Sequence, residues 1–302
     1  MVTDEKLPTD ELNVLYRTGA RWGQDRRLEF IEYRLLWNDH LNRSDLTSFF
    51  GISVPQASLD LADYGRRAPG NLEYDKSTRT YIATANFKPI FESSNLERYL
   101  GDLLNTATSP DLRYGSFLGW HPPIAVTPKP GRHLSALMVK TIVKSIRDGN
   151  ALRVRYQSFS RPDASLRTIT PHAIAHDGSR FHIRAYCHSR NQFLDFLVSR
   201  ILEIEGTQQD RSRGTEDSEW HNIVRLVLAP HPSLAETHRK VIELDYGMTD
   251  GVCEFECRQA LLFYVLRQLG LEDESNRSPE AQQIILSNRA ELAQFLPKTN
   301  FR

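Results

Sequence analysis

Residues 43–84 read RSDLTSFFGISVPQASLDLADYGRRAPGNLEYDKSTRTYIAT, and this stretch decides the fold of the first third of the chain. Ser44 is expected to cap a short helix, because an acidic residue and an apolar face follow it. Gly51 ends that helix. Ser53 is expected to cap a second helix, with Pro55 in its first turn. Two short helices joined by a tight turn are therefore predicted.

The second helix and the hairpin after it complete a recognisable pattern. Ala57, Leu61 and Tyr64 fall at i, i+4 and i+7 and form one buried face. The other faces of the helix are expected to carry Gln56, Ser58, Leu59, Asp60 and Asp63. Residues 72–74 and 80–82 alternate around a polar tip with two cations, which predicts a hairpin. Helix, turn, helix and basic hairpin is the layout of a winged helix-turn-helix, in which the second helix enters the major groove of DNA. The alternative is a packing module that never touches DNA.

Residues suited to DNA contact gather on the second helix and the hairpin. The candidates for base edges are Ser53, Gln56 and Ser58, since Gln reads adenine and Ser serves base or phosphate. The candidates for phosphate are Arg43, Arg66, Lys76 and Arg79. For each of these cations the alternative is a side chain that is only solvated.

Composition limits the function classes. The chain has 302 residues, of which 40% are hydrophobic and 25% charged, as expected for a globular protein of two or three domains. No apolar run approaches the length of a membrane span, and the N-terminus is acidic and polar, so a cytoplasmic protein without a membrane partner is expected. The three cysteines supply neither a disulfide framework nor a zinc site.

The net charge of zero hides an uneven distribution. Residues 17–90 carry +2, residues 129–206 carry +7 and residues 207–302 carry −4. A charge of +2 favours a dimer that doubles the DNA contacts. The basic middle of the chain indicates an anionic ligand of its own.

Turn-rich stretches divide the chain into predicted parts. They are a winged helix-turn-helix over 10–90, a linker helix and turn-rich linker over 91–133, a sheet domain over 134–206 and an α+β domain over 220–302. Strands over 152–159 and 180–187 predict a small, strongly bent antiparallel sheet or partial barrel. One face of the second strand holds Arg180, His182, Arg184 and Tyr186, and it is expected to lie open to solvent or a ligand. In the last part, helices are predicted over 259–269 and 279–295.

No catalytic motif is visible. The chain lacks Gly-x-Ser-x-Gly, Gly-x-Gly-x-x-Gly, a Walker loop and His-Glu-x-x-His. Its ten histidines form no ligand-spaced pair on a predicted helix. An enzyme is therefore not expected, and neither a cofactor nor a metal is predicted.

Two stretches carry a resemblance to a known family. They are the run RRLEFIEYRLLWNDHLNRSDLTSFFGISVPQASLDL at residues 26–61 and a frame made of residues 151–158, 170–172, 180–183 and 199–201. On these residues the chain resembles the WYL-domain transcriptional regulators, in particular the CapW/BrxR-type repressors beside bacterial anti-phage defence operons. The name-giving Trp-Tyr-Leu is Phe181-His182-Ile183 here, and Leu194 stands where family members often have arginine.

The resemblance implies an α+β multidomain protein with an N-terminal winged helix-turn-helix, a central Sm-like β-barrel (WYL) domain and a C-terminal α+β dimerisation domain. It implies a homodimer that represses from an inverted repeat in double-stranded operator DNA. It also implies that the WYL domain senses an anionic nucleotide or single-stranded nucleic acid. The sensor candidates are Tyr156, Ser158, His172, His182, Arg184 and Arg200.

Each sensor candidate has a proposed role and an alternative. Tyr156 or His182 would stack on a base, and Arg184 and Arg200 would grip phosphate. Alternatively, Arg200 holds a structural carboxylate such as Glu203, and His172 is an interior histidine. Two other functions share the architecture: a transcriptional activator, and an accessory protein that binds nucleic acid without sequence preference.

Overall fold

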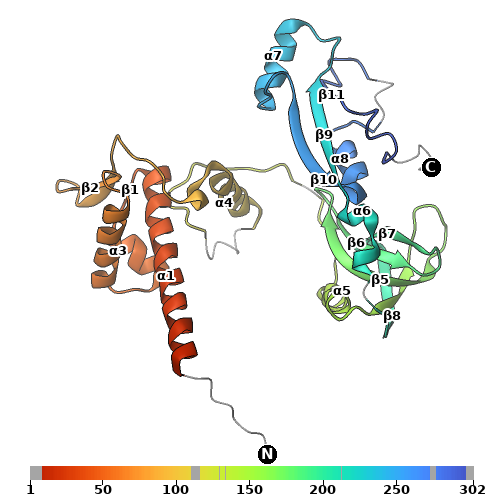
Figure 1. The fold of residues 1–302 in the computed structure, drawn as a ribbon, viewed down its shortest axis with the longest axis horizontal. Helices are drawn as coiled ribbons and strands as arrows, with labels where there is room; N and C mark the ends of the chain where they lie inside the picture. The colour runs from red at the N-terminus through yellow and green to blue at the C-terminus, as the bar shows by residue number, and fades with distance from the viewer. Residues whose placement is uncertain are drawn as a thin grey trace, which may run out of the picture. The chain divides into compact units, whose positions relative to one another are not determined.

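The computed structural model divides the chain into two compact units, residues 1–128 and 129–302 (Figure 1). It describes residues 9–109, 116–128, 130–132, 134–211, 213–272 and 277–296, and within helix α1 the side chains from residue 23 onward. None of the helices in these ranges is long and apolar enough to cross a membrane.

The first unit is built on one long helix. Its elements are α1 (Thr9–Asn38), β1 (His40–Leu41), α2 (Arg43–Phe50), α3 (Val54–Arg67), β2 (Leu72–Asp75) and β3 (Thr80–Ala83). Strand β3 pairs antiparallel with both β2 and β1, which forms a three-stranded wing. Leu28, Ile31 and Leu35 of α1 are fully buried against α2 and α3. This is the predicted winged helix-turn-helix.

Local capping explains where α2 and α3 begin and end. Asn42, not Ser44, is the N-cap of α2, and its backbone N–H donates to the Asp45 carboxylate at 2.6 Å. The prediction for Ser44 was wrong, because Asn42 is an equally good capping residue and places Ser44 inside the first turn. Gly51 ends α2 with φ +66°, a left-handed conformation that favours glycine. Ser53 caps α3 as predicted, accepting from the N–H of Gln56 at 3.3 Å.

A buried carboxylate fastens the chain as it leaves the wing. Glu32 of α1 is fully buried and accepts hydrogen bonds from the Tyr64 hydroxyl at 3.1 Å and from the backbone N–H groups of Ile90 and Phe91, each at 2.8 Å. A 3₁₀ turn (Glu92–Ser94) and helix α4 (Leu96–Thr108) follow. Glu32 therefore fixes the path of this segment against α1 and α3.

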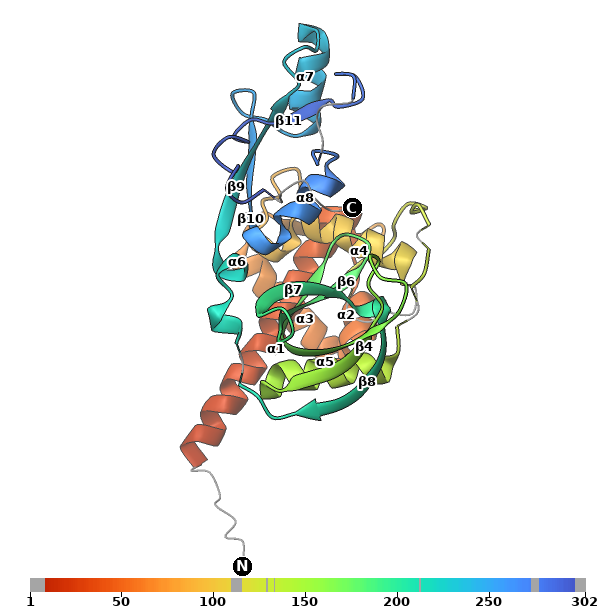
Figure 2. The ribbon, with the colours of Figure 1, turned by 90° about the vertical axis from the view of Figure 1, so that its right-hand side faces the viewer.

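The second unit begins with the sheet domain. Helix α5 (Ala136–Asp148) precedes β4 (Ala151–Tyr156), β5 (Ser165–His176), β6 (Phe181–Cys187) and β7 (Gln192–Leu197), and a 3₁₀ turn (Val198–Arg200) leads into β8 (Ile201–Gln208). The antiparallel sheet has the order β7-β6-β5-β4-β8, so its last strand returns to pair with its first (Figure 2). Register shifts interrupt the β4–β8 and β5–β6 ladders, which bends the sheet as predicted.

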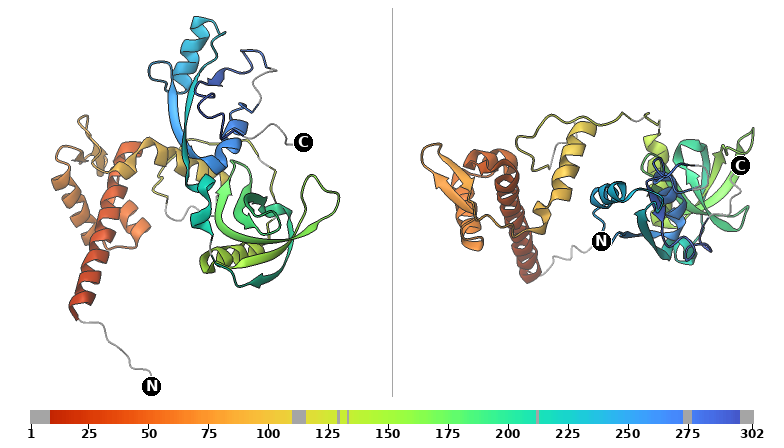
Figure 3. Two further views of the ribbon diagram at one scale, coloured as in Figure 1. Left: turned by 45° about the vertical axis from the view of Figure 1, so that its right-hand side comes forward. Right: turned by 90° about the horizontal axis from the view of Figure 1, so that it is seen from above.

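The final part pairs two long strands. Its elements are a 3₁₀ turn (Gly214–Glu216), α6 (Ser218–His221), β9 (Ile223–Pro230), α7 (Glu236–Asp245), β10 (Cys253–Arg258), a 3₁₀ turn (Gln259–Leu261), α8 (Leu262–Gln268) and β11 (Ile284–Leu286). Strand β9 lies between β10 and β11, with α7 near one end of the ribbon (Figure 3). The helix predicted over 279–295 was wrong: the segment forms β11 and turns, because Ile284 and Leu286 alternate inward.

Candidate nucleic-acid and ligand-binding sites

The face of helix α3 that packs on the core contains both apolar residues and one carboxylate. Ala57, Leu61 and Tyr64 are buried, as the spacing predicted. Asp60, expected on another face, is also fully buried, so that expectation was wrong. Its carboxylate accepts from the Arg27 guanidinium at 2.7 Å, and this pairing compensates for the loss of water. Arg27 thereby anchors α3 to α1.

Three of the DNA candidates, Arg43 at the start of α2 and Gln56 and Ser58 on α3, form hydrogen bonds within the domain. The Arg43 guanidinium donates to the Ser58 hydroxyl at 2.8 Å and to the Tyr81 hydroxyl at 2.5 Å. The Gln56 side-chain amide donates to Asp60 at 3.0 Å. These bonds brace α2, α3 and the wing against one another. The candidate Ser53 is exposed at the N-cap of α3.

The cationic candidates fall into two groups. Arg66 is exposed and donates to Asp63 at 2.7 Å, an ion pair that a phosphate can replace. Lys76 and Arg79 lie exposed at the wing tip, where the described residues give neither of them an ion pair. Hydrogen bonds from Ser77 and Thr78 hold the tip and lower the pKa of Asp75 to about 2. The wing tip therefore presents two cations on a braced turn.

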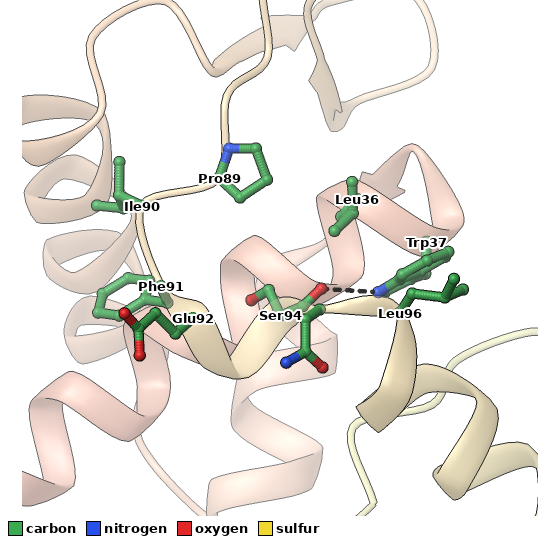
Figure 4. A pocket seen from close by; sticks show the side chains of 9 residues that line it. Leu36, Trp37, Pro89, Ile90, Phe91, Glu92, Ser94 and Leu96 are labelled. Carbon is green, nitrogen blue, oxygen red and sulfur yellow. Dashed lines mark hydrogen bonds between the residues drawn. The ribbon is translucent and has the colours of Figure 1, made fainter. Parts of the chain in front are cut away.

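An apolar hollow of about 450 Å³ lies in the same unit, where the segment after the wing crosses the end of α1. The Trp37 indole N–H donates to the Ser94 carbonyl oxygen at 3.3 Å (Figure 4). Ile90 and Leu96 line the hollow and are about half exposed, at 47% and 54%. No pattern in the sequence marks this feature, because its walls come from two segments far apart in the chain, residues 36–37 and 89–96.

In the sheet domain, the polar face of β6 is covered rather than open. Arg184 is 4% exposed, and its guanidinium donates to Asp217 at 2.7 and 3.0 Å. It also donates to Glu219 at 2.6 Å and to Asp195 at 3.4 Å. The expectation that this face lies open was therefore wrong. Carboxylates from α6 and its N-cap, and from β7, neutralise the arginine and allow it to be buried.

Both histidine candidates belong to the same network, which we call the Arg184 cluster: His172, His182, Arg184, Asp177, Asp195, Asp217, Glu219 and Tyr264. His172 contacts Asp217 at 2.9 Å, and His182 contacts Asp177 at 2.9 Å. The Tyr264 ring of α8 lies 4.7 Å from the His182 ring, and its hydroxyl donates to Asp195 at 3.1 Å. The cluster therefore joins the sheet domain to α6 and α8.

The charges in the cluster shift each other's ionisation. Burial alone would raise the pKa of Asp217, but hydrogen bonds from His172 and Arg184 outweigh it and hold that pKa well below its ordinary value. Burial raises the pKa of Asp195, although Arg184 and Tyr264 oppose the shift. Asp217 also caps α6 by accepting from the N–H of Trp220 at 3.3 Å. One carboxylate thus orders both a helix and the buried arginine.

Tyr156 is not available to stack on a base. It is 9% exposed and packs against Phe196, with ring centroids 5.1 Å apart, while its hydroxyl accepts from the N–H of Leu197 at 3.2 Å. The strict alternation of β4 places it on the core side of the sheet. Its predicted stacking role is therefore wrong.

Ser158 and Arg200 come together where β4 ends. The N–H of Gln157 donates to the Arg200 carbonyl oxygen at 3.0 Å, which holds the two segments side by side. Arg200 has no carboxylate partner among the described residues, and Glu203 instead lies 3.9 Å from Arg155. The Arg200 guanidinium lies 5.8 Å from the centre of the Phe159 ring, which is 87% exposed. Sequence reasoning missed Phe159, whose signal is a large apolar side chain within a polar turn.

Comparisons with known proteins agree with this architecture. The model of the BrxR transcriptional regulator winged helix-turn-helix domain matches residues 23–105, that of the WYL domain matches 138–205, and that of the BrxR C-terminal dimerization domain matches 223–292. Three relatives are each described as "DNA-binding transcriptional repressor CapW". The one from Pseudomonas aeruginosa is 50% identical over 98% of this chain and 99% of its own length.

The other two relatives are similar over nearly as much of the chain. The relative from Escherichia coli (strain KTE188) is 50% identical over 93% of this chain and 94% of its own length. The relative from Stenotrophomonas maltophilia is 44% identical over 92% of this chain and 93% of its own length. Fold and comparisons together define a winged helix-turn-helix regulator with a WYL domain. The chain belongs to the BrxR/CapW-type family of WYL-domain transcriptional repressors, which confirms the prediction that it is not an enzyme.

Proposed function

We propose that this protein is a homodimeric repressor that binds an inverted repeat in double-stranded operator DNA through α3 and the wing. The observation that carries the proposal is its 50% identity, over 98% of its length, to a protein described as a DNA-binding transcriptional repressor. The exposed wing-tip cations and the outward face of α3 support it. The match of residues 223–292 to a dimerization domain supports the homodimer. The sequence resemblance points to a bacterial defence operon as the target.

The proposal also assigns a sensor role to the WYL domain. An anionic nucleotide or single-stranded nucleic acid binds at Arg200 and Ser158 and relieves repression. Three features support this site: a guanidinium without a carboxylate partner among the described residues, the exposed Phe159 beside it, and the Ser158 hydroxyl, whose oxygen is buried and has no hydrogen-bond partner among those residues. An arginine next to an aromatic ring suits a phosphate together with a base.

Thermodynamic linkage between ligand binding and DNA binding determines how a ligand can relieve repression. It relieves repression only by binding the arrangement of the dimer that is not on DNA more tightly than the arrangement that is. A shift from 1:99 to 99:1 requires about 5.5 kcal/mol of differential binding. One arginine does not supply that, so both copies of the site in the dimer must contribute.

The test is Arg200→Ala in a reporter strain and in vitro. We expect the variant to bind the operator as the wild type does and to lose induction. The matched control is Arg147→Ala, an exposed arginine of α5, which should leave both properties unchanged. A folded Arg200→Ala protein that no longer binds the operator would show that the sensor assignment is wrong. Reporter expression that falls when the gene is deleted would identify an activator instead.

A further inference from the structure

Helix α3 carries two apolar stripes with the same spacing. Ala57, Leu61 and Tyr64 form the buried stripe at i, i+4 and i+7. Pro55, Leu59 and Ala62 repeat this spacing two residues earlier and are all exposed. At about 100° per residue, a shift of two residues places the second stripe on the opposite side of the helix. The face that α3 turns away from its own core is therefore largely apolar.

The polar side chains of α3 are occupied within the domain. Gln56 donates to Asp60, Ser58 accepts from Arg43 and also donates to the Val54 carbonyl oxygen at 3.1 Å, and Arg66 donates to Asp63. For Gln56 or Ser58 to reach a base edge, these bonds must first break. The apolar stripe has no such bonds to lose.

Leu59 is the large side chain at the middle of the exposed stripe. It is 64% exposed and is the sixth residue of a helix that runs from Val54 to Arg67. In a helix-turn-helix, the N-terminal half of the second helix meets the base edges. The apolar group that a base pair offers in the major groove is the C5-methyl of thymine.

We infer that Leu59 reads a thymine methyl group in each half-site of the operator. This inference rests on the proposed DNA binding and names the part of the operator that α3 recognises. Burying one methyl group against Leu59 is worth a factor of about four in Kd per half-site, or about 15-fold when both half-sites of a dimer are changed.

The experiment uses the full-length protein and a duplex selected from a random pool by repeated binding. Each thymine of the selected site is replaced by deoxyuridine, which removes only the methyl group, and Kd is measured by fluorescence anisotropy. For the wild type we expect one symmetric pair of thymines whose joint replacement weakens binding about 15-fold. For Leu59→Ala we expect weaker binding to the unmodified duplex and no effect of uracil at that pair.

Two further variants complete the test. Leu59→Met keeps an apolar side chain and should retain the sensitivity to uracil. Leu137→Ala removes a leucine of α5 that is 73% exposed and should behave as the wild type. A selected duplex that tolerates uracil everywhere, or a Leu59→Ala protein that keeps the wild-type sensitivity, would overturn the inference while leaving the proposed function intact. Failure to enrich any duplex over the random pool would instead remove the proposed function.

Discussion

Arg184→Met removes the central cation of the Arg184 cluster and tests whether that cluster holds the sheet domain to the C-terminal part. The wild-type Arg184 side chain is 5% exposed, and its guanidinium donates two hydrogen bonds to Asp217, whose side chain is 1% exposed. Without it, Asp217 keeps only His172 and the N–H of Trp220 as partners among the described residues. Breaking a buried ion pair on one side costs about 3–5 kcal/mol, because the remaining charge stays buried.

The structure supplies a matched control for this loss. Glu219 contacts the same guanidinium at 2.6 Å but is 52% exposed. An ion pair with an exposed partner contributes about 0–1 kcal/mol, so Glu219→Gln should cost less than about 1 kcal/mol. The double variant Arg184→Met with Asp217→Leu removes both partners of the pair and should cost less than the sum of the two single losses.

Hydrogen exchange of the β6 amides measures these effects in the full-length protein. A loss of about 3–5 kcal/mol lowers the protection of residues 181–187 by about two to almost four orders of magnitude. The α1–α3 amides serve as an internal reference and should keep their protection. Protection of β6 that changes by less than tenfold in Arg184→Met would refute the argument, because it would show that Arg184 is solvated rather than buried.

Three further predictions concern other parts of the chain. Lys76→Ala should weaken binding to selected and random duplexes by the same factor. It should also make the slope of log Kd against log salt concentration shallower by about 2, because each copy in the dimer loses one phosphate contact. Lys140→Ala on α5 should change neither property, and anisotropy titrations at several salt concentrations measure both. Gly51→Ala should lower the free energy of unfolding by about 1–2 kcal/mol, because φ is +66° at this position, whereas Gly101→Ala inside α4 should raise it by up to about 1 kcal/mol. Urea denaturation measures both changes. Changes of the same sign would contradict the left-handed conformation of Gly51. The pKa of Asp217 lies below its unfolded value of about 3.9, so its ionised form stabilises the fold above that pH, and the contribution is lost as pH falls through the lower folded value. Denaturation from about pH 6 down to about pH 2 should therefore show a smaller acid-induced loss in Asp217→Asn than in the wild type.

Local signals account for most of the helix-turn-helix prediction. The Ser53 cap, the stop at Gly51 and the apolar spacing of α3 act between residues close in sequence, and the structure confirms each of them. Asp60 was misplaced because its partner, Arg27, lies 33 residues earlier on α1. The residues around Asp60 in the sequence do not indicate that an arginine on another helix pairs with its carboxylate.

The covering of β6 and the strand β11 depend on contacts between residues far apart in the sequence, which local patterns did not reveal. The groups that cover β6 come from Asp217 and Tyr264, which lie 33 and 82 residues away from the side chains they contact. The segment over 279–295 was predicted as a helix from its apolar content. In the structure β11 pairs with β9, and the Asn288 side chain accepts from the Val227 N–H at 3.0 Å, across 61 residues of sequence. An apolar run cannot reveal a strand partner that lies so far away along the chain.

The most direct test of the central claim is one anisotropy titration at about 0.15 M salt. It compares duplex from the region upstream of the protein's own gene with a scrambled duplex, each with and without short single-stranded DNA. We predict tight binding to the upstream duplex alone and release by the single strand. Equal affinity for both duplexes would contradict the claim of a sequence-specific repressor.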